Sequence, residues 1–323
     1  MISLGVESTA HTFGIGIIND KGEVLANAKD MYKTEKGGIL PTEAKEHHLR
    51  LKNEILERAL KEAKLRIEDM DIISFSQGPG LPPCLVVGKD FAKELALKYK
   101  KPLVGVNHLI SHLEIGKIFT KAKDSVFILA TGANTQIIAF EGEKYRIFGE
   151  CLSIAVGNAL DKFGRNIDLG FPAGPRIEEL AKKGKYIEMP YVVKGMDVEY
   201  SGIVTHAVNL YKKGAKKEDL CFSIQETIFS MLTEVAERAM AHTGKKELLL
   251  IGGVAANKRL IEMLTIMCNE RKAKFYVVPV EYSGDQGVMI AWQGVLEYKR
   301  NKKYYNNLDI KKVDINSNWR IDG

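Results

Sequence analysis

The sequence predicts an α/β protein with two lobes, because one order of strands and helices occurs twice along the chain. Each half begins with three short apolar segments separated by polar turns, which is the pattern of an antiparallel meander. Helical periodicity then alternates with short apolar segments, whose crossover connections favour parallel pairing. The length of 323 residues also exceeds the usual limit of a single hydrophobic core, so two βββαβαβα units are expected.

The first unit is expected within residues 1–124. Leu49, Leu56 and Leu60 lie near helical spacing and predict an amphipathic helix after the meander. The polar stretch 19–22 ends in glycine and predicts the turn between the second and third strands. The expected strands are 1–7, 12–18, 23–28, 72–76 and 103–106, and the expected helices are 43–64 and 84–99.

The second unit is expected within residues 125–298. The stretch 151–215 is rich in glycine and proline and has short helical patches, so it is interpreted as an insertion in this lobe. The tail 299–323 is expected to return to the first lobe. The expected strands are 126–130, 135–140, 144–148, 248–251 and 275–278, and the expected helices are 219–242, 257–270 and 285–298.

This duplicated order is typical of the actin-like fold that sugar kinases, Hsp70 and actin share. In that fold a nucleotide lies between the lobes, beside the first turn of each meander. Because one fold can host unrelated activities, the function has to be sought in individual residues.

Charge and cysteine content restrict the class of protein. Lys and Arg exceed Asp and Glu by 47 − 41 = 6, and lysine runs lie at 182–185, 212–217 and 299–303. Such runs are often only solvated surface, but they also suit a polyanionic partner. The four cysteines form no C-x-x-C pair, the first residues lack a signal sequence, and no apolar run reaches the roughly 20 residues of a membrane helix. A cytoplasmic protein without a membrane partner is therefore expected.

Two histidines have metal-ligand spacing. His108 and His112 are four residues apart, and Asn107 is expected to cap a helix that would carry both imidazoles on one face. Seven histidines in 323 residues predict roughly 0.15 such pairs by chance, so the spacing alone is only suggestive. A metalloprotease helix needs Glu directly after the first His, where this chain has Leu109. Asp285, near an expected helix start, is a candidate third ligand that spacing does not connect to the pair.

Several glycine-containing turns could present backbone N–H groups to an anion. The stretch 252–257 follows an expected strand and opens a helix, where free N–H groups and the helix dipole favour negative charge. The turns at 132–135 and 170–175 also contain glycine, but the sequence has neither a P-loop nor a Rossmann motif. Glu7 ends the first expected strand. Its position is consistent with a carboxylate near a metal or phosphate, and equally with a strand end that is only exposed to solvent.

Five motifs in order resemble the universal tRNA N6-adenosine threonylcarbamoyltransferase family, and in particular its archaeal and eukaryotic branch, the catalytic subunit of the KEOPS complex. They are GVESTAHTFG at 5–14, GPGLPPCL at 78–85, VNHLISH at 106–112, AVGNALDKF at 155–163 and GGVAAN at 252–257. The resemblance extends from residue 1 to about residue 298, and residues 320–322 resemble the family's C-terminal tail.

The resemblance implies roles for particular residues. His108, His112 and Asp285 match the family's metal ligands. Glu7 and His11 match positions near the phosphates and are the candidates for a catalytic role. The positions that match nucleotide contacts are Leu129, Ala130, Thr131, Gly132, Ala133, Asp161, Gly174, Glu178 and Asn257.

The resemblance also implies a reaction and its participants. The family transfers a threonylcarbamoyl group from threonylcarbamoyl-adenylate to N6 of the adenosine next to the anticodon, in tRNAs that read codons beginning with A. The implied cofactor is one transition metal, iron ahead of zinc, with ATP or threonylcarbamoyl-adenylate as the nucleotide ligand. The implied partners are tRNA, a small protein kinase and a helical dimerisation subunit.

This chain departs from the family pattern at four positions. Leu129 stands where archaeal members usually carry a Tyr metal ligand, so the metal would have three protein ligands plus substrate or water. The other departures are Val86 in place of a common Arg, Ala133 in place of Gly and Gln286 in place of Asn.

Two rival functions follow from the residues alone. A small-molecule kinase of the same fold would need a catalytic carboxylate for a hydroxyl nucleophile and would not need the histidine pair. A non-catalytic subunit that binds nucleic acid or acts as a scaffold is consistent with the charge of +6.

Overall fold

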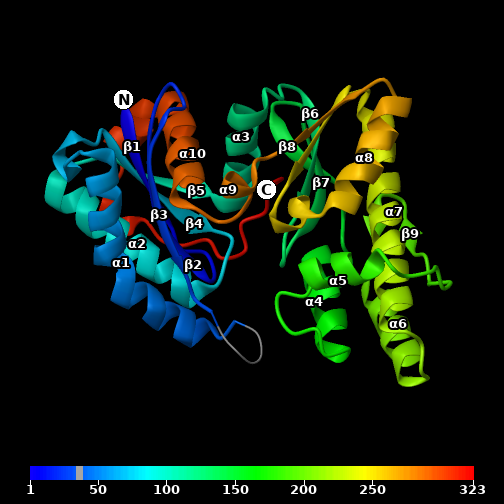
Figure 1. The fold of residues 1–323 in the computed structure, drawn as a ribbon. Helices are drawn as coiled ribbons and strands as arrows, with labels where there is room; N and C mark the ends of the chain where they lie inside the picture. The colour runs from blue at the N-terminus through cyan, green and yellow to red at the C-terminus, as the bar shows by residue number, and fades with distance from the viewer. Residues whose placement is uncertain (34–38) are drawn as a thin grey trace. The chain divides into compact units, whose positions relative to one another are not determined.

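The computed structural model describes residues 1–33 and 39–323. Its contacts form two compact units, each built on one five-stranded sheet (Figure 1). Unit 1 comprises residues 1–118, 284–321 and 323, and unit 2 comprises residues 119–283 and 322. In the described part of the chain, no helix is long and apolar enough to cross a membrane.

The sheet of unit 1 has the order β3-β2-β1-β4-β5. The first three strands pair antiparallel, whereas β4 and β5 pair in parallel, which confirms the expected meander and crossovers. The bounds are β1 Ile2–Glu7, β2 Thr12–Asn19, β3 Val24–Met31, β4 Ile72–Gly78 and β5 Leu103–Asn107, with helices α1 Pro41–Ala63, α2 Pro82–Tyr99, α3 His108–Thr120, α10 Gly287–Arg300 and α11 Lys302–Asn306.

Alternate residues of β1 face different helices. Leu4 and Val6 are completely buried in a cluster with apolar residues of α1 and α2. Gly5 points to the other face, where a Cβ atom would lie 2.2 Å from the backbone N of Ala291 in α10. Because successive strand residues alternate between faces, Glu7 shares the face of Gly5. The face that carries α10 is therefore also the face onto which Glu7 projects.

A seam of glycines brings α10 into backbone contact with the sheet. A Cβ atom at Gly16 would lie 2.0 Å from the backbone N of Val288, and one at Gly287 would lie 2.0 Å from the backbone N of Gly16. Real Cβ atoms do not approach backbone this closely, so only glycine permits the observed packing. The seam fixes the start of α10 against β2.

We predict that Gly16→Ala destabilises unit 1. The added methyl must displace α10, and overpacking of this kind costs typically about 1 to 3 kcal/mol. The free energy of unfolding from denaturant titration should fall by that amount. A matched control is Gly202→Ala in α6 (Ser201–Lys212), where a Cβ would have no neighbour within 4 Å and alanine favours the helix. Equal stability of the two variants would contradict the role given to the seam.

The sheet of unit 2 repeats the first topology in the order β12-β11-β6-β7-β8. Strand β11 pairs in parallel with both β6 and β12. The bounds are β6 Ser125–Ala130, β7 Thr135–Glu141, β8 Lys144–Glu150, β11 Glu247–Ile251 and β12 Lys274–Val277, with helices α7 Lys217–Thr243, α8 Lys258–Glu270 and α9 Val280–Ser283.

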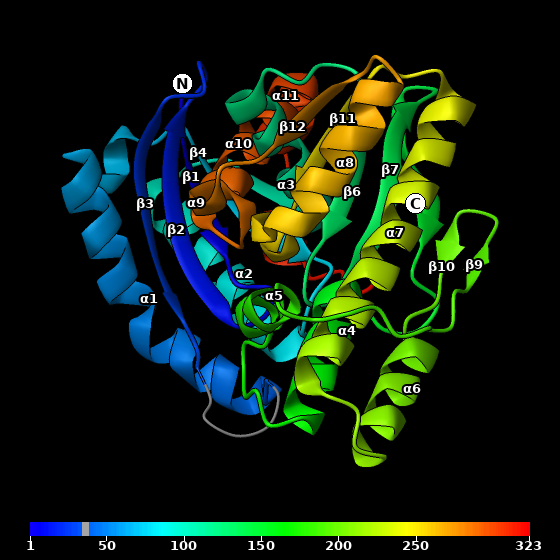
Figure 2. The same cartoon turned by 45° about the vertical axis from the view of Figure 1, so that its right-hand side comes forward.

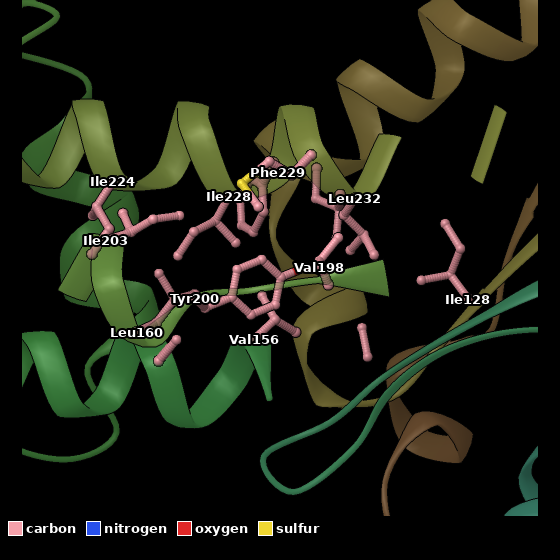
Figure 3. Packing of buried hydrophobic residues seen from close by; sticks show 14 of the residues in the cluster. Ile128, Val156, Leu160, Val198, Tyr200, Ile203, Ile224, Ile228, Phe229 and Leu232 are labelled. Atoms are coloured by element: carbon pink, nitrogen blue, oxygen red, sulfur yellow. The ribbon is translucent and has the colours of Figure 1, made fainter. Parts of the chain in front are cut away.

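The expected insertion at 151–215 is part of the core of unit 2. It contains α4 Val156–Asn166, α5 Gly174–Ala181, α6 Ser201–Lys212 and the hairpin of β9 Val193–Lys194 and β10 Asp197–Val198 (Figure 2). Figure 3 shows the completely buried Tyr200 beside Leu160 of α4, Ile203 of α6 and Ile228 of α7. The insertion is therefore packed against the long helix rather than appended to it.

The C-terminal residues lie along unit 1. Gln77 accepts a backbone hydrogen bond from Asn316 at 2.8 Å, and Lys93 Nζ donates to the carbonyls of Lys311 and Val313 at 2.9 Å each. Helix α10 also belongs to unit 1, whereas the sequence expectation counted residues up to 298 with the second lobe. Periodicity predicted this helix but contains no information about which sheet it covers.

Candidate functional site

The histidine pair lies at the start of α3, as its spacing predicts. Asn107 Oδ1 accepts hydrogen bonds from the backbone N–H groups of Leu109 at 2.9 Å and Ile110 at 3.1 Å, so Asn107 caps the helix. His108 and His112 are one turn apart, with ring centroids separated by 4.8 Å and ring planes at 89°. Both residues are buried, so the two imidazoles are held in fixed positions.

Asp285 reaches the pair from a distant part of the sequence. It lies two residues before α10, which the glycine seam fixes against β2. Strand β3 supports the same segment, because Lys29 Nζ donates to the Asp285 carbonyl at 3.2 Å and Asn27 Nδ2 donates to Gln286 Oε1 at 2.8 Å. Elements β2, β3, α10 and α3 thus bring Asp285 and the two histidines together within unit 1.

The three side chains form what we call the His-Asp cluster: His108, His112 and Asp285. Asp285 Oδ1 lies 3.4 Å from His108 Nε2 and 3.3 Å from His112 Nε2, and the ligand atoms all lie within 4.8 Å of one another. Two ligands each about 2.1 Å from one ion at a tetrahedral angle lie about 3.4 Å apart. The two distances from Asp285 to the histidines are therefore those of ligands on one ion, and two imidazoles with one carboxylate are a donor set that suits a transition metal.

The electrostatics of the cluster follow from burial and close charges. Burial lowers the pKa of His108, but the Glu7 and Asp285 carboxylates outweigh it and raise the pKa to about 10. Burial lowers the pKa of His112, and Asp285 opposes that shift only in part. Burial works against ionisation of Asp285, yet hydrogen bonds from the two histidines hold its pKa well below the usual value. The two carboxylates thus favour a positive charge at His108, and a metal ion could take the place of the proton that supplies it.

Glu7 orients the imidazole of His108 through a hydrogen bond to its Nδ1. Its side chain is completely buried, and Oε2 accepts a hydrogen bond from His108 Nδ1 at 2.9 Å. Thr9 holds the other carboxylate oxygen through its backbone N–H at 2.7 Å and its hydroxyl at 2.5 Å. Without a metal, Nε2 donates its proton to Asp285; a bound metal would replace that proton, and Nδ1–H on Glu7 would then give the arrangement of a metal-ligating histidine with a carboxylate partner. The alternative of a solvated strand end is wrong.

His112 has a different environment. Its Nδ1 is buried and has no hydrogen-bond partner among the residues that the structure describes. Glu7 thus supports only one of the two histidines directly.

His11 lies at the edge of the cluster. Its Nδ1 is 3.9 Å from Asp285 Oδ2, which is too long for a hydrogen bond, and 32% of its side chain is exposed. Tyr32 N–H donates to the His11 carbonyl at 2.7 Å and fixes the backbone there. A catalytic role for His11 stays a prediction.

The predicted nucleotide positions of unit 2 gather where β6 and β11 end. These strands are parallel neighbours, and such carboxyl ends are the usual ligand sites of α/β sheets. Leu129 and Ala130 are completely buried and leave no surface for a ligand to contact. Gly132 and Ala133 are exposed in the turn that follows. Gly252 begins the β11 loop at a φ of 106°, with a Cβ position 2.2 Å from the Ala130 carbonyl oxygen, so glycine is required.

Hydrogen bonds connect the other predicted nucleotide positions to this end of the sheet. Asp161 Oδ1 accepts from the Ala173 N–H at 2.7 Å, directly before Gly174. Glu178 Oε1 accepts from the Lys258 N–H at 2.9 Å. Asn257 precedes that residue and caps α8 by accepting from the backbone of Arg259 and Leu260. All four positions therefore lie around the N-terminal ends of α5 and α8. The carboxylates of Asp161 and Glu178 each already accept a hydrogen bond from a backbone N–H group.

Sequence reasoning missed the residues that support the cluster. Thr9 lies inside the quoted 5–14 motif but received no role, and Asn27 and Lys29 lie in an ordinary strand pattern. No sequence signal marked these residues, because the pairing of Lys29 with Gly14 that places β3 beside the glycine seam is seen only in the structure.

Comparison with known proteins identifies the chain. The family model for TsaD, tRNA N6-adenosine threonylcarbamoyltransferase, matches residues 23–292. The protein of that name from Thermococcus sibiricus is 53% identical, over 100% of this chain and 98% of its own length. A probable bifunctional tRNA threonylcarbamoyladenosine biosynthesis protein from Methanocaldococcus jannaschii is 50% identical over the whole chain, which spans 59% of that protein.

Solved structures agree at the level of the fold. Full-length HypF in a phosphate- and nucleotide-bound form gives a TM-score of 0.63 at 12% identity and covers 93% of this chain and 56% of HypF. A ROK hexokinase from Thermus thermophilus gives 0.51 at 14% identity, over 93% and 100% of the two chains. These are proteins of the expected actin-like class, and identities this low carry no statement about activity. The family model and the 53% identity to a named transferase establish that the chain belongs to the TsaD family of tRNA N6-adenosine threonylcarbamoyltransferases.

Proposed function

We propose that the chain transfers the threonylcarbamoyl group of threonylcarbamoyl-adenylate to N6 of the adenosine next to the anticodon, in tRNAs that read ANN codons, with a metal held by the His-Asp cluster. The observation that carries this proposal is the convergence of His108, His112 and Asp285, in a chain 53% identical to a named transferase. Neither the kinase nor the scaffold alternative is favoured by that match.

The donor set supports a particular class of metal. Two imidazoles and one carboxylate suit iron or zinc rather than magnesium, which prefers oxygen ligands. We propose iron ahead of zinc, in keeping with the family resemblance. When bound, the metal would supply a Lewis acid for a carbonyl oxygen or a template for the substrate.

The reaction needs no covalent nucleophile on the protein. The N6 amine attacks the carbamoyl carbon, the bond from that carbon to the phosphate oxygen breaks, AMP leaves, and N6 loses one proton. Glu7 holds a His108 proton at Nδ1, so Nε2 is the ring atom that would face a bound metal. Thr9 keeps the Glu7 carboxylate in place with two hydrogen bonds.

We propose that the turn of Thr131, Gly132 and Ala133 binds the phosphates and that Asp161, Gly174, Glu178 and Asn257 bind the adenosine. Exposed backbone in the turn suits an anion, whereas carboxylates suit ribose hydroxyls. Glu178 is partly exposed, so its second oxygen remains available to a ligand while the first accepts from Lys258.

Glu178→Ala is accordingly expected to weaken binding of ATP by about 1 to 3 kcal/mol, the usual loss for a hydrogen bond to a charged group. Isothermal titration calorimetry measures this. The control is Glu179→Ala, which removes the neighbouring carboxylate that pairs with Lys182 on the surface. Equal affinities of the two variants for ATP would argue against this assignment.

We further propose that the chain works with a small protein kinase and a helical dimerisation subunit, as in the KEOPS complex. The bifunctional name of the Methanocaldococcus jannaschii relative supports an association of activities. The whole proposal is tested by incubating the chain with threonine, bicarbonate, ATP, an adenylate-forming synthase and tRNA, with and without those partners. Mass spectrometry of the nucleosides should find threonylcarbamoyladenosine only when the chain is present.

A further inference from the structure

Residues 299–312, which we call the basic segment, have the highest net positive charge of the stretches around the three lysine runs. It holds six Lys or Arg residues and one Asp, so its net charge is 6 − 1 = +5. The whole chain has 47 − 41 = +6, which leaves +1 for all other residues together. Charge this concentrated creates a local field that attracts polyanions.

An aromatic ring is exposed within the basic segment. Tyr304, in α11, is 61% exposed although it is a large side chain. Its ring meets that of Tyr305 edge to face at 5.1 Å, and Tyr305 in turn lies 6.4 Å from the ring of Tyr298 in α10. The Tyr298 hydroxyl donates to Asn306 at 2.8 Å. Tyr304 is therefore presented to solvent on a supported base rather than on a loose chain end.

The lysines beside Tyr304 are available for a ligand. Lys302 and Lys303 are exposed and form no ion pair within the described residues. Together with Arg300, Tyr304, Leu308 and Asp309 they line a shallow depression of about 650 Å³. Other charges of the segment are partly offset, because Lys299 pairs with Asp20 and Lys312 with Asp309. The depression thus joins Lys302 and Lys303 to an exposed ring, whereas its Arg300 pairs with Glu297 at 3.9 Å.

The other two lysine runs lack this combination. Residues 178–191 include an exposed tyrosine, Tyr186, but three Glu cancel three Lys, so the net charge is 3 − 3 = 0. Residues 204–217 have a net charge of +4, but Tyr211 is only partly exposed and lies under Lys217 Nζ at 5.4 Å from its ring centroid. Of the three lysine runs, the basic segment alone joins excess charge to an open aromatic face.

We propose that the basic segment binds an unpaired stretch of the tRNA substrate, with one base stacked on Tyr304 and flanking phosphates on Lys302 and Lys303. Cationic side chains around an exposed aromatic ring are the chemistry that recognises single-stranded nucleic acid. A double helix keeps its bases stacked inside, so the ring selects an unpaired segment. The inference rests on the proposed function only for the identity of the RNA.

The test compares full-length variants that remove the same number of charges. Lys302→Ala with Lys303→Ala is set against Lys182→Ala with Lys183→Ala, and binding of an unmodified tRNA transcript is measured by fluorescence anisotropy at several salt concentrations. The first pair should lower the slope of log affinity against log salt by about 1.4, since each single-strand phosphate contact contributes about 0.7. The second pair should leave the slope unchanged. Equal effects of the two pairs would overturn the proposal.

The aromatic contribution is separated by substitution of the ring. Tyr304→Ala should weaken binding of a short oligouridylate by about 5- to 150-fold, while Tyr304→Phe should stay near wild type because stacking needs only the ring. If Tyr304→Phe is as weak as Tyr304→Ala, or if binding of polyglutamate falls as much as binding of RNA, the stacking site is refuted. Metal content and threonylcarbamoyladenosine formation are measured in parallel. An inactive wild type with intact, Tyr304-dependent RNA binding would refute the proposed function and leave this inference standing.

Discussion

Replacing both His108 and His112 with alanine is expected to abolish metal binding and transferase activity. The change removes two of the three ligand atoms and leaves Asp285 alone, and one carboxylate does not hold a transition metal at micromolar concentration. Elemental analysis of protein purified without chelators should give a near-stoichiometric metal for the wild type and none for the double variant. The fold should persist, because Asn107 still caps α3 and the glycine seam is untouched.

A matched control removes two imidazoles outside the cluster. His206 in α6 and His242 in α7 form no part of it, so His206→Ala with His242→Ala should retain the metal. Undiminished metal in the His108 and His112 variant, with circular dichroism unchanged in both, would contradict the assignment of ligands.

The second large effect is expected from Glu7→Gln. Glutamine keeps the shape of the side chain but removes the negative charge that holds the Nδ1 proton of His108. Loss of such a carboxylate partner typically costs 10- to 100-fold in metal affinity. A competition titration with a chelator of known affinity measures the change, and activity at saturating metal should recover in part because the ligands themselves remain.

Two comparisons make this prediction specific. Glu54→Gln removes a carboxylate that is 61% exposed and pairs only with Arg58, so it should leave metal affinity at the wild-type value. Thr9→Val removes one of the two hydrogen bonds to Glu7 Oε1 and should have a smaller effect than Glu7→Gln. A metal affinity for Glu7→Gln equal to that of Glu54→Gln would show that Glu7 does not position His108.

Local patterns in the sequence were enough to predict the elements and one half of the cluster. The expected helix at 43–64 is α1 Pro41–Ala63, and the expected cap Asn107 has the hydrogen bonds of an N-cap. Spacing of four residues along a helix placed His108 and His112 together, because that contact depends only on helical geometry.

The other half of the site depends on packing that no local pattern contains. Asp285 is 173 residues from His112, and long-range contacts, among them that of Gly16 with Gly287, bring its segment to the histidines. The sequence predicts that Glu7 lies at a strand end. It does not predict the hydrogen-bond partner of the Glu7 carboxylate, because that partner depends on which face of β1 is covered by α10. Periodicity predicts that a helix is amphipathic and is silent about which sheet it covers.

The most direct test of the account is the formation of threonylcarbamoyladenosine in tRNA, followed with and without metal. Wild-type chain stripped of metal should be inactive in the reconstituted reaction and should regain activity on addition of iron, or zinc if that is the native ion. The variant with His108→Ala and His112→Ala should stay inactive under both conditions. Full activity of the double variant, or of the stripped wild type held in chelator, would contradict the central claim that the His-Asp cluster holds the metal on which the transfer depends.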